Sequence, residues 1–271
     1  MNRIDKTLAH LNAHHKKMLS PYITAGDPHP DVTVDLMHEL VKAGADIIEL
    51  GIPFSDPMAE GPVIQRAMER ALSYSISTKD VLEMVSRFRQ KDSETPIIIM
   101  GYLNPIEQYG YTHFAQDAVR AGVDGTILVD LPPEESGDIA KIWEEHGLYS
   151  IYLCSPTTSE QRMALIAKYA KGYLYYVSLK GVTGSDTLNT ELVQGQYQQR
   201  KAQTHLPLMV GFGIKTAEMA AAIARFADGV IVGAALISRI EEAYPEKNNF
   251  MNAAGRLIND MRQAIDKNGT K

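Results

Sequence analysis

The sequence lacks the features that mark secreted and membrane-spanning proteins. It holds a single cysteine, Cys154, so no disulfide can form within the chain, and the apolar neighbours YSIYLC predict a buried strand with a core thiol rather than a nucleophile. No segment approaches the ~18 uninterrupted apolar residues of a transmembrane helix, and the N-terminus has no apolar run of the signal-peptide type. We therefore expect a soluble, cytoplasmic protein.

Charge of one sign is not concentrated anywhere in the chain. The formal net charge is −6 over 271 residues, and acidic and basic residues are interspersed rather than gathered in blocks. This pattern argues against a surface for nucleic acid or for an anionic membrane. The apolar fraction of 45% is ample for a large core, which excludes an intrinsically disordered chain.

What the sequence does contain is a long alternation of strand-like and helix-like segments. Eight apolar runs predict strands at residues 18–26, 46–51, 96–102, 125–130, 149–154, 173–178, 207–213 and 228–233. Helical patterns are found at residues 2–15, 30–43, 61–72, 78–89, 111–121, 133–146, 159–169, 190–203, 216–226, 234–243 and 248–267.

Eight strands alternating with helices over about 250 residues is the count of a (β/α)8 TIM barrel, and continuously apolar strands are typical of buried parallel strands. A doubly wound open sheet fits less well, because evenly spaced units without a break in composition leave no second domain. We therefore predict a single α/β domain over residues 1–271, a (β/α)8 barrel with an extra N-terminal helix. Its active site should lie at the C-terminal ends of the strands.

Two carboxylates flank the loop that follows the second predicted strand. Glu49 lies within the apolar strand DIIELG, and Glu60 stands just before a helix that begins at Gly61-Pro62. Because Glu49 has no easy route to water, we expect its pKa to rise and its carboxyl to act as a general acid and base. The structural alternatives are an ion pair for Glu49 and a helix-dipole contact for Glu60.

Glycine turns follow the sixth, seventh and eighth predicted strands. Backbone N–H groups at such turns can approach an anion, and the last two loops are the usual phosphate site of this barrel class. The alternative is tight turns that serve only packing. The polar segment 178–190 has the composition of a closing lid. The residues of these turns are Gly181 and Gly184 in GVTG, Gly211 and Gly213 in GFGI, and Gly233 before Ala234 in VGAA.

Flat or apolar side chains should line the barrel mouth beside these turns. Each of them alone is better explained as core, but together they predict a hydrophobic slot next to a phosphate site. No predicted strand end carries a set of metal ligands, so we expect no metal. The lining residues are Tyr22, Met100, Ile127, Val129, Tyr175 and Phe212.

Seven short motifs, spread over nearly the whole chain, resemble the tryptophan synthase alpha subunit family. The resemblance implies a lyase of tryptophan biosynthesis that cleaves indole-3-glycerol phosphate by a retro-aldol reaction to indole and glyceraldehyde 3-phosphate. It implies no cofactor in this subunit and a beta-subunit partner that carries pyridoxal phosphate, in an alpha2beta2 complex. The motifs are PYITAGDP (21–28), ELGIPFSDP (49–57), GPVIQ (61–65), GYLNP (101–105), DLPPEE (130–135), GVTG (181–184) and GFGI (211–214).

The resemblance also implies roles for single residues. Glu49 is the principal acid and base, and Glu60 interacts with the indole N–H. Tyr175 lies beside the substrate, and Thr183 closes onto the loop carboxylate. The phosphate is held by backbone N–H groups of Gly184, Gly213 and the turn at Gly233 and Ala234. The loops that face the partner contain residues 53–56, Asn104 and Pro132.

Three positions depart from the family's pattern. Glu60 stands where the family usually has aspartate, Ala234 stands where it usually has serine, and Tyr22 stands where phenylalanine is common. The first change favours an alternative in which the chain is a catalytically weak partner that mainly activates a beta subunit. An isomerase or epimerase acting on a sugar phosphate is a further alternative, and the apolar slot argues against it.

Overall fold

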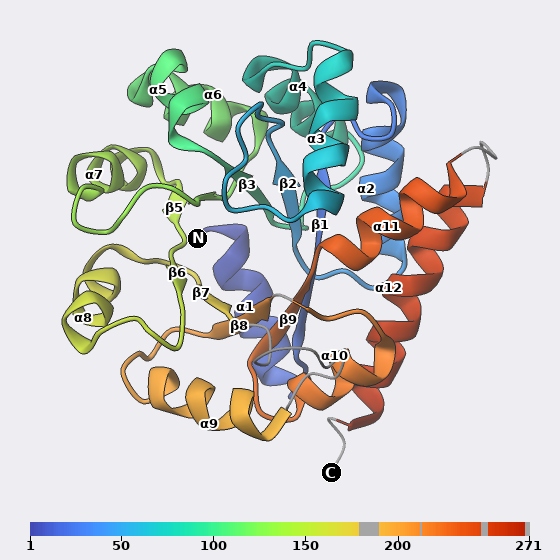
Figure 1. Cartoon of the computed structure of the whole chain (residues 1–271). Helices are drawn as coiled ribbons and strands as arrows, with labels where there is room; N and C mark the ends of the chain where they lie inside the picture. Colours follow the sequence, from blue (N-terminus) through green and yellow to red (C-terminus); the bar gives the residue numbers. More distant parts are fainter. Residues whose placement is uncertain (179–189, 212, 245–248, 269–271) are drawn as a thin grey trace.

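The strands close into a parallel barrel that helices surround (Figure 1). The computed structural model describes residues 1–178, 190–211, 213–244 and 249–268, and in this part nine strands form one sheet in the order β5-β4-β3-β2-β1-β9-β8-β7-β6. All pairings in this sheet are parallel. The strands are β1 (Met18–Thr24), β2 (Ile48–Gly51), β3 (Ile97–Gly101), β4 (Gly125–Leu128), β5 (Tyr149–Ser150), β6 (Leu153–Cys154), β7 (Leu174–Val177), β8 (Leu208–Gly211) and β9 (Gly229–Val232).

One barrel strand is interrupted. β5 pairs with β4, and β6 pairs with β7, with only Ile151 and Tyr152 between the two short pieces. The segment 149–154 therefore joins the two edges of the sheet and closes it into eight strand segments. This confirms the predicted (β/α)8 barrel.

The helices form the outer ring, and one more covers an end of the barrel. Their ends agree with the predicted segments to within a few residues. α5 was not predicted, because it has only seven residues and contains Pro105. Proline is tolerated at this position because it lies in the first turn of the helix. The described helices are α1 (Arg3–Ala13), α2 (Thr33–Lys42), α3 (Pro62–Ser73), α4 (Thr78–Arg89), α5 (Leu103–Tyr109), α6 (Tyr111–Ala121), α7 (Gly137–His146), α8 (Glu160–Tyr169), α9 (Thr190–Lys201), α10 (Ala217–Ala224), α11 (Ala234–Ala243) and α12 (Asn249–Asn268), with a 3-10 turn η1 (Pro30–Val32).

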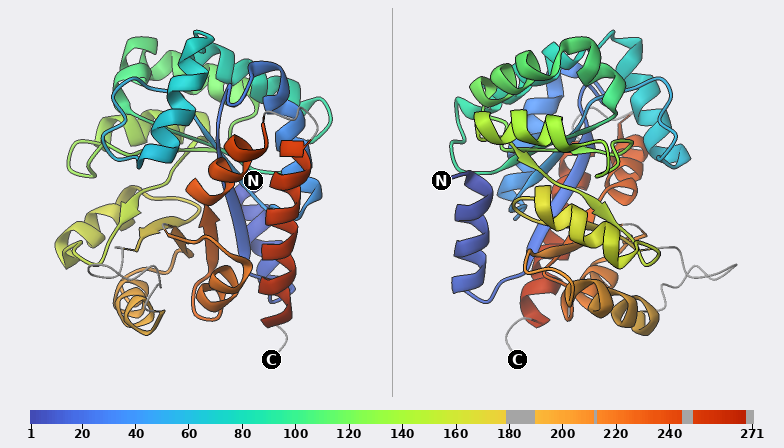
Figure 2. Two further views of the ribbon diagram at one scale, coloured as in Figure 1. Left: turned by 45° about the vertical axis from the view of Figure 1, so that its right-hand side comes forward. Right: turned by 90° about the vertical axis from the view of Figure 1, so that its left-hand side faces the viewer.

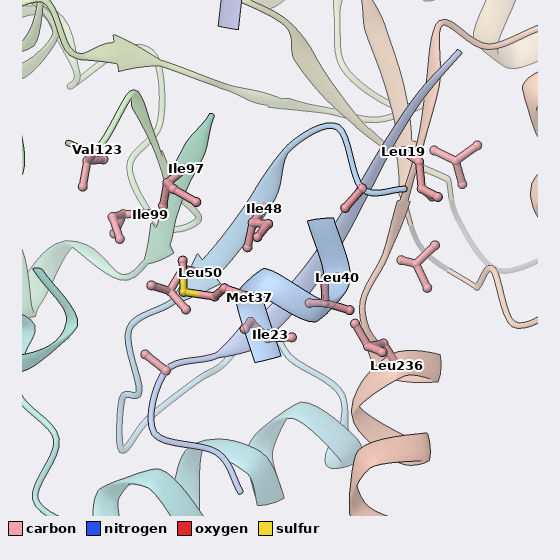
Figure 3. Close-up of a cluster of buried hydrophobic side chains, with 14 of the residues drawn as sticks. Leu19, Ile23, Met37, Leu40, Ile48, Leu50, Ile97, Ile99, Val123 and Leu236 are labelled. Carbon is pink, nitrogen blue, oxygen red and sulfur yellow. The ribbon is translucent and has the colours of Figure 1, made fainter. Parts of the chain in front are cut away.

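Alternation along β2 decides which side chains enter the barrel. Ile48 and Leu50 point outward and pack against Met37 and Leu40 of α2 in the layer between strands and helices (Figure 3). Because successive strand residues face opposite sides, Glu49 between them points into the barrel. Side chains of the neighbouring strands likewise alternate between the barrel interior and the layer below the helices.

The barrel interior is filled from the end where the strands begin. Ile4 and Leu11 of α1 join the interior cluster of side chains from the strands, so that α1 closes this end, as the right-hand view of Figure 2 shows. The opposite end, where the strands finish, remains for the site. None of the described helices combines the length and the apolarity that crossing a membrane requires. The other members of the interior cluster include Met18, Ile98, Ile127, Met209 and Ile231 of the strands, and Ile47 and Tyr173, which directly precede β2 and β7.

The single cysteine is a core residue, as predicted. Cys154 on β6 is buried and belongs to the layer between the strands and the helices. Burial raises the pKa of its thiol to about 12. A thiol held in this state is a poor nucleophile at neutral pH.

Candidate active site

Glu49 is fully buried inside the barrel, and one of its carboxyl oxygens is hydrogen-bonded. The Tyr173 hydroxyl donates to Oε1 over 2.9 Å, whereas Oε2 has no hydrogen-bond partner in the described part of the chain. Burial raises the pKa of Glu49 to about 8, and the nearby charge of Glu60 raises it further, while the hydroxyls of Tyr173 and Ser20 oppose the rise. The expected rise in pKa is confirmed.

Such an environment suits a group that both gives and takes a proton. At neutral pH the Glu49 carboxyl is mostly protonated, yet its pKa of about 8 lies close enough for the ionised form to be reached. Glu49 has no ion-pair partner among the residues that the structure describes, so the structural alternative of a salt bridge does not hold there.

A consequence for stability follows from the raised pKa of Glu49. Above the unfolded-state pKa of about 4.5 the unfolded chain ionises at this position, while the folded chain stays protonated up to about 8. The contribution of Glu49 to the free energy of unfolding is therefore full below about pH 4.5 and is lost as the pH rises towards 8. In urea denaturation we measure the free energy of unfolding of the wild type minus that of Glu49→Gln. We expect this difference to be lower at about pH 8 than at about pH 5. A difference that is constant with pH would contradict the raised pKa.

Glu60 lies in the β2–α3 loop and is half-buried. Burial raises its pKa to about 7. The loop is held on both sides of this residue, because the Ala59 N–H donates to the Tyr102 hydroxyl over 3.0 Å and the Gln65 side chain donates to the Glu60 carbonyl over 2.8 Å. Tyr102 in turn stacks on Phe54 at 5.1 Å between ring centroids. The position of Glu60 therefore depends on specific contacts rather than on the helix N-terminus alone.

Tyr175 lies near both carboxyl groups. Its pKa is raised well above the ordinary value, first by burial and then by the charges of Glu49, Glu60 and Tyr22, which places these four groups in one electrostatic environment. The neighbouring strand makes room for the ring, since a Cβ atom at Gly211 would lie 2.2 Å from the Tyr175 hydroxyl oxygen. Glycine at position 211 is thus required by the approach of Tyr175.

The five predicted slot residues that the structure describes pack in two adjoining clusters, joined by Met100. Tyr22 stands opposite Glu49 in the pairing of β1 with β2, and its hydroxyl shares a 3.1 Å hydrogen bond with Thr24. Tyr22 packs with side chains of α3 and α11 and with Met100, and Met100 also packs against the barrel interior. Ile127, Val129 and Tyr175 belong to that interior cluster.

The predicted phosphate turns are described in part. Gly213 has a φ of 79°, the left-handed conformation that favours glycine, and Gly233 is the N-cap of α11. A Cβ atom at Gly233 would lie 3.7 Å from both Tyr22 and Ile64, so this turn borders the slot. Ala234 begins the helix. The Leu236 and Ile237 N–H groups donate to the Gly233 carbonyl, whereas those of Ala234 and Ala235 precede the first hydrogen bond of the helix. Thr183, Gly184 and Phe212 lie outside the described residues.

Three hydroxyl groups of the site were not predicted from the sequence. Tyr173 bonds to Glu49, Ser20 lies beside it, and Tyr102 holds the loop of Glu60. A signal was present for the first two, because Tyr173 and Tyr175, like Ser20 and Tyr22, are two residues apart on a strand and so share a face. Tyr102 had no such signal.

We expect Tyr173→Phe to shift the pH dependence of catalysis. The Tyr173 hydroxyl stabilises the ionised form of Glu49, so its removal should raise the pKa of Glu49 above about 8. The alkaline limb of the kcat/KM profile should then move to higher pH. Tyr109→Phe is the control, since it removes a hydroxyl that donates to Asp117 on the outer ring. If the alkaline limb did not move in Tyr173→Phe, the Tyr173 hydroxyl would not influence the pKa of Glu49.

The fold and the site together define a (β/α)8 barrel with a buried carboxyl of raised pKa in its interior. In the described part of the chain no group of three or more His, Cys, Asp or Glu side chains could hold a metal ion. The sequence pattern of the tryptophan synthase alpha chain family matches residues 8–266. The chain therefore belongs to the tryptophan synthase alpha chain family.

Relatives and solved structures agree with this assignment. The tryptophan synthase alpha chain of Legionella pneumophila (strain Lens) is 70% identical over 270 residues, which cover 100% of this chain and 99% of the relative. The crystal structure of tryptophan synthase subunit alpha from Legionella pneumophila str. Paris superposes with a TM-score of 0.94 at 68% identity, covering 98% and 99% of the two chains. Aminoacrylate-bound tryptophan synthase from M. tuberculosis gives a TM-score of 0.86 at 30% identity, covering 98% and 100%.

Proposed function

We propose that Glu49 and Glu60 carry the reaction that family membership assigns to this chain. As a member of the tryptophan synthase alpha chain family it is a carbon–carbon lyase that cleaves indole-3-glycerol phosphate to indole and glyceraldehyde 3-phosphate in tryptophan biosynthesis. The observation that supports these roles is the buried Glu49 carboxyl with a pKa of about 8, with Glu60 in the same electrostatic environment.

Glu49 can return to its starting state within one cycle. In the proposed reaction its carboxyl gives a proton to C3 of the indole ring, which leaves positive charge on the ring nitrogen. The bond between C3 and the glycerol carbon then breaks, its electron pair restores the aromatic ring, and the hydroxyl on that carbon becomes the aldehyde. The hydroxyl proton passes to the Glu49 carboxylate, so protons and electrons balance.

Glu60 would act on the ring nitrogen during these steps. An ionised carboxylate next to the N–H stabilises the positive charge that the ring carries after protonation at C3. The pKa of Glu60 of about 7 makes the ionised form accessible at neutral pH. The slot of Tyr22, Met100, Ile127 and Tyr175 supplies the apolar walls for the indole.

The phosphate would lie at the turns after β8 and β9, on backbone N–H groups. We expect Gly213→Val to raise KM by about tenfold or more, because the side chain enters the space of the anion and a branched residue is strained at a φ of 79°. Gly147→Val is the matched control, since Gly147 has a φ of 78° and a Cβ atom there meets no atom within 4 Å. If Gly147→Val raised KM as much as Gly213→Val does, backbone strain, and not loss of the anion site, would explain the rise in KM.

The beta subunit is the partner of this chain within tryptophan synthase. We propose that the loops containing residues 53–56, Asn104 and Pro132 face it. A groove of about 380 Å³ lies beside the first of these loops, and Met58 at its edge has an exposed fraction of 85%. A second groove, of about 360 Å³, is lined by Pro132 and its neighbours.

The proposed steps use only side chains of this chain and its backbone. We propose that the subunit works without a cofactor of its own, that pyridoxal phosphate belongs to the beta subunit, and that the chain is a cytoplasmic protein folded as one domain over residues 1–271. The direct test of function is a coupled assay for release of glyceraldehyde 3-phosphate from indole-3-glycerol phosphate, with and without a beta subunit. Absence of release under both conditions would refute the proposed activity.

A further inference from the structure

Two helices lie side by side at the site, and each begins where the proposed chemistry takes place. α3 begins at Pro62, two residues after Glu60, and α11 begins at Ala234, next to the phosphate turn at Gly233 (Figure 1). Near these ends the helices pack on each other through apolar side chains: the cluster contains Val63, Ile64, Ala67 and Ile237, together with Tyr22. The distance between the Glu60 loop and the phosphate turn therefore depends on how α3 and α11 are held together.

Further along, charged side chains cross-link the same two helices. Glu241 of α11 accepts hydrogen bonds from Arg66 Nε over 2.9 Å and Nη2 over 2.7 Å, which form a bidentate pair, and from Arg70 Nη1 over 2.6 Å. Both arginines belong to α3 and lie one turn apart. A bidentate arginine–carboxylate pair constrains orientation as well as distance.

The cross-link is anchored to the barrel through a buried aspartate. Arg70 also donates from Nε and Nη2 to the two carboxylate oxygens of Asp27, over 2.6 Å and 3.2 Å. Asp27 follows β1 and has an exposed fraction of 1%. Its pKa is raised by burial, against the opposing effect of Arg70, while the pKa of Glu241 is lowered to about 2, chiefly by its hydrogen bonds with Arg66. Glu241 is thus ionised throughout the neutral pH range.

We infer that Asp27, Arg66, Arg70 and Glu241, which we term the helix clasp, are positioning residues that set the span between Glu60 and the phosphate turn. The inference rests on the proposed function, in which indole-3-glycerol phosphate is held at both ends. A substrate of fixed length gains from two correctly spaced sites, and a displacement of about 1 Å at one of them can cost up to about 10²-fold in rate. A ligand that occupies only one end has no such requirement.

The variant Glu241→Gln tests the clasp with little risk to folding. Glu241 is partly exposed, and Arg70 keeps its two hydrogen bonds to the buried Asp27. The expected result is a fall of about tenfold in kcat/KM for indole-3-glycerol phosphate. Glu242→Gln is the matched control and should leave kcat/KM unchanged. Glu242 is on the same helix, and among the described residues it forms an ion pair only with Arg239 of that helix, at 3.6 Å.

Binding measurements separate a change of span from a general loosening. We expect Glu241→Gln to weaken the binding of a non-cleavable analogue, in which a propyl chain joins indole to phosphate, by about the same factor as kcat/KM. Binding of glycerol phosphate, which occupies one end only, should change by less than about twofold. Equal loss for both ligands, or a lower melting temperature with unchanged kinetics and binding, would overturn the inference.

The same measurements keep this inference distinct from the proposed function. If the wild type binds the two-ended analogue but releases no glyceraldehyde 3-phosphate, the proposed catalytic roles fail, and the effect of Glu241→Gln on analogue binding still decides the clasp. If the wild type cleaves the substrate and Glu241→Gln cleaves it equally well, the proposed function stands and the clasp fails.

Discussion

Glu49→Gln should lower kcat for cleavage of indole-3-glycerol phosphate by about 10²–10⁴-fold, the usual contribution of a general acid–base group. The amide resembles the protonated carboxyl in size and can still accept the hydrogen bond from Tyr173, but it can neither give nor take a proton. Because the buried carboxyl is mostly protonated at neutral pH, the replacement removes no buried charge. The fold should therefore survive the change that removes the chemistry.

Two measurements accompany the kinetics of this variant. Circular dichroism and the affinity for glycerol phosphate should match the wild type, since Glu49 takes no part in the phosphate turns. A loss of kcat together with a loss of glycerol phosphate binding would indicate misfolding instead. A variant that keeps more than about a tenth of the wild-type kcat would remove Glu49 from the mechanism.

The ring of helices was predictable where local signals mark both ends of an element. The predicted bounds of α4, α6 and α11 agree with the structure to the residue. A Ser77–Asp80 capping box marks the start of α4, and Gly122 in the left-handed conformation marks the end of α6. Both signals can be recognised in the local sequence. The break between β5 and β6 has no such signal, because Ile151 and Tyr152 are as apolar as the rest of the strand.

The candidate site was predictable where a residue type is unusual for its sequence neighbourhood. Glu49 was identified because a carboxyl is costly within an apolar strand. Tyr173 and Tyr102 were not, because a tyrosine in such a segment fits an ordinary core position and its hydrogen bond becomes visible only in the fold. The helix clasp is a stronger case, since Arg70 is 43 residues from Asp27 and 171 from Glu241. No local pattern encodes pairs at these separations.

Glu60→Asp is the variant that decides whether the longer acid is an adapted part of the site. The loop around Glu60 is fixed by the contacts of Ala59 with Tyr102 and of Gln65 with the Glu60 carbonyl. If Glu60 has the proposed role, a shorter side chain on this fixed loop would not reach the ring nitrogen. Loss of one charged hydrogen bond is worth about 1.5–3 kcal/mol, so we expect kcat to fall by about 10- to 150-fold.

The opposite sign is the result expected of a chain that mainly activates its partner. If Glu60 were a substitution without adaptation of the loop, aspartate would restore the arrangement usual in the family and kcat would rise. The measurement is kcat with saturating beta subunit, so that partner binding does not limit the rate. Glu83→Asp, at an exposed position of α4, is the matched control for shortening an acid outside the site. We expect the fall, because Tyr175 lies within the electrostatic influence of both Glu49 and Glu60, as the proposed reaction requires. An increase in kcat on Glu60→Asp would show that Glu60 is not adapted to catalysis.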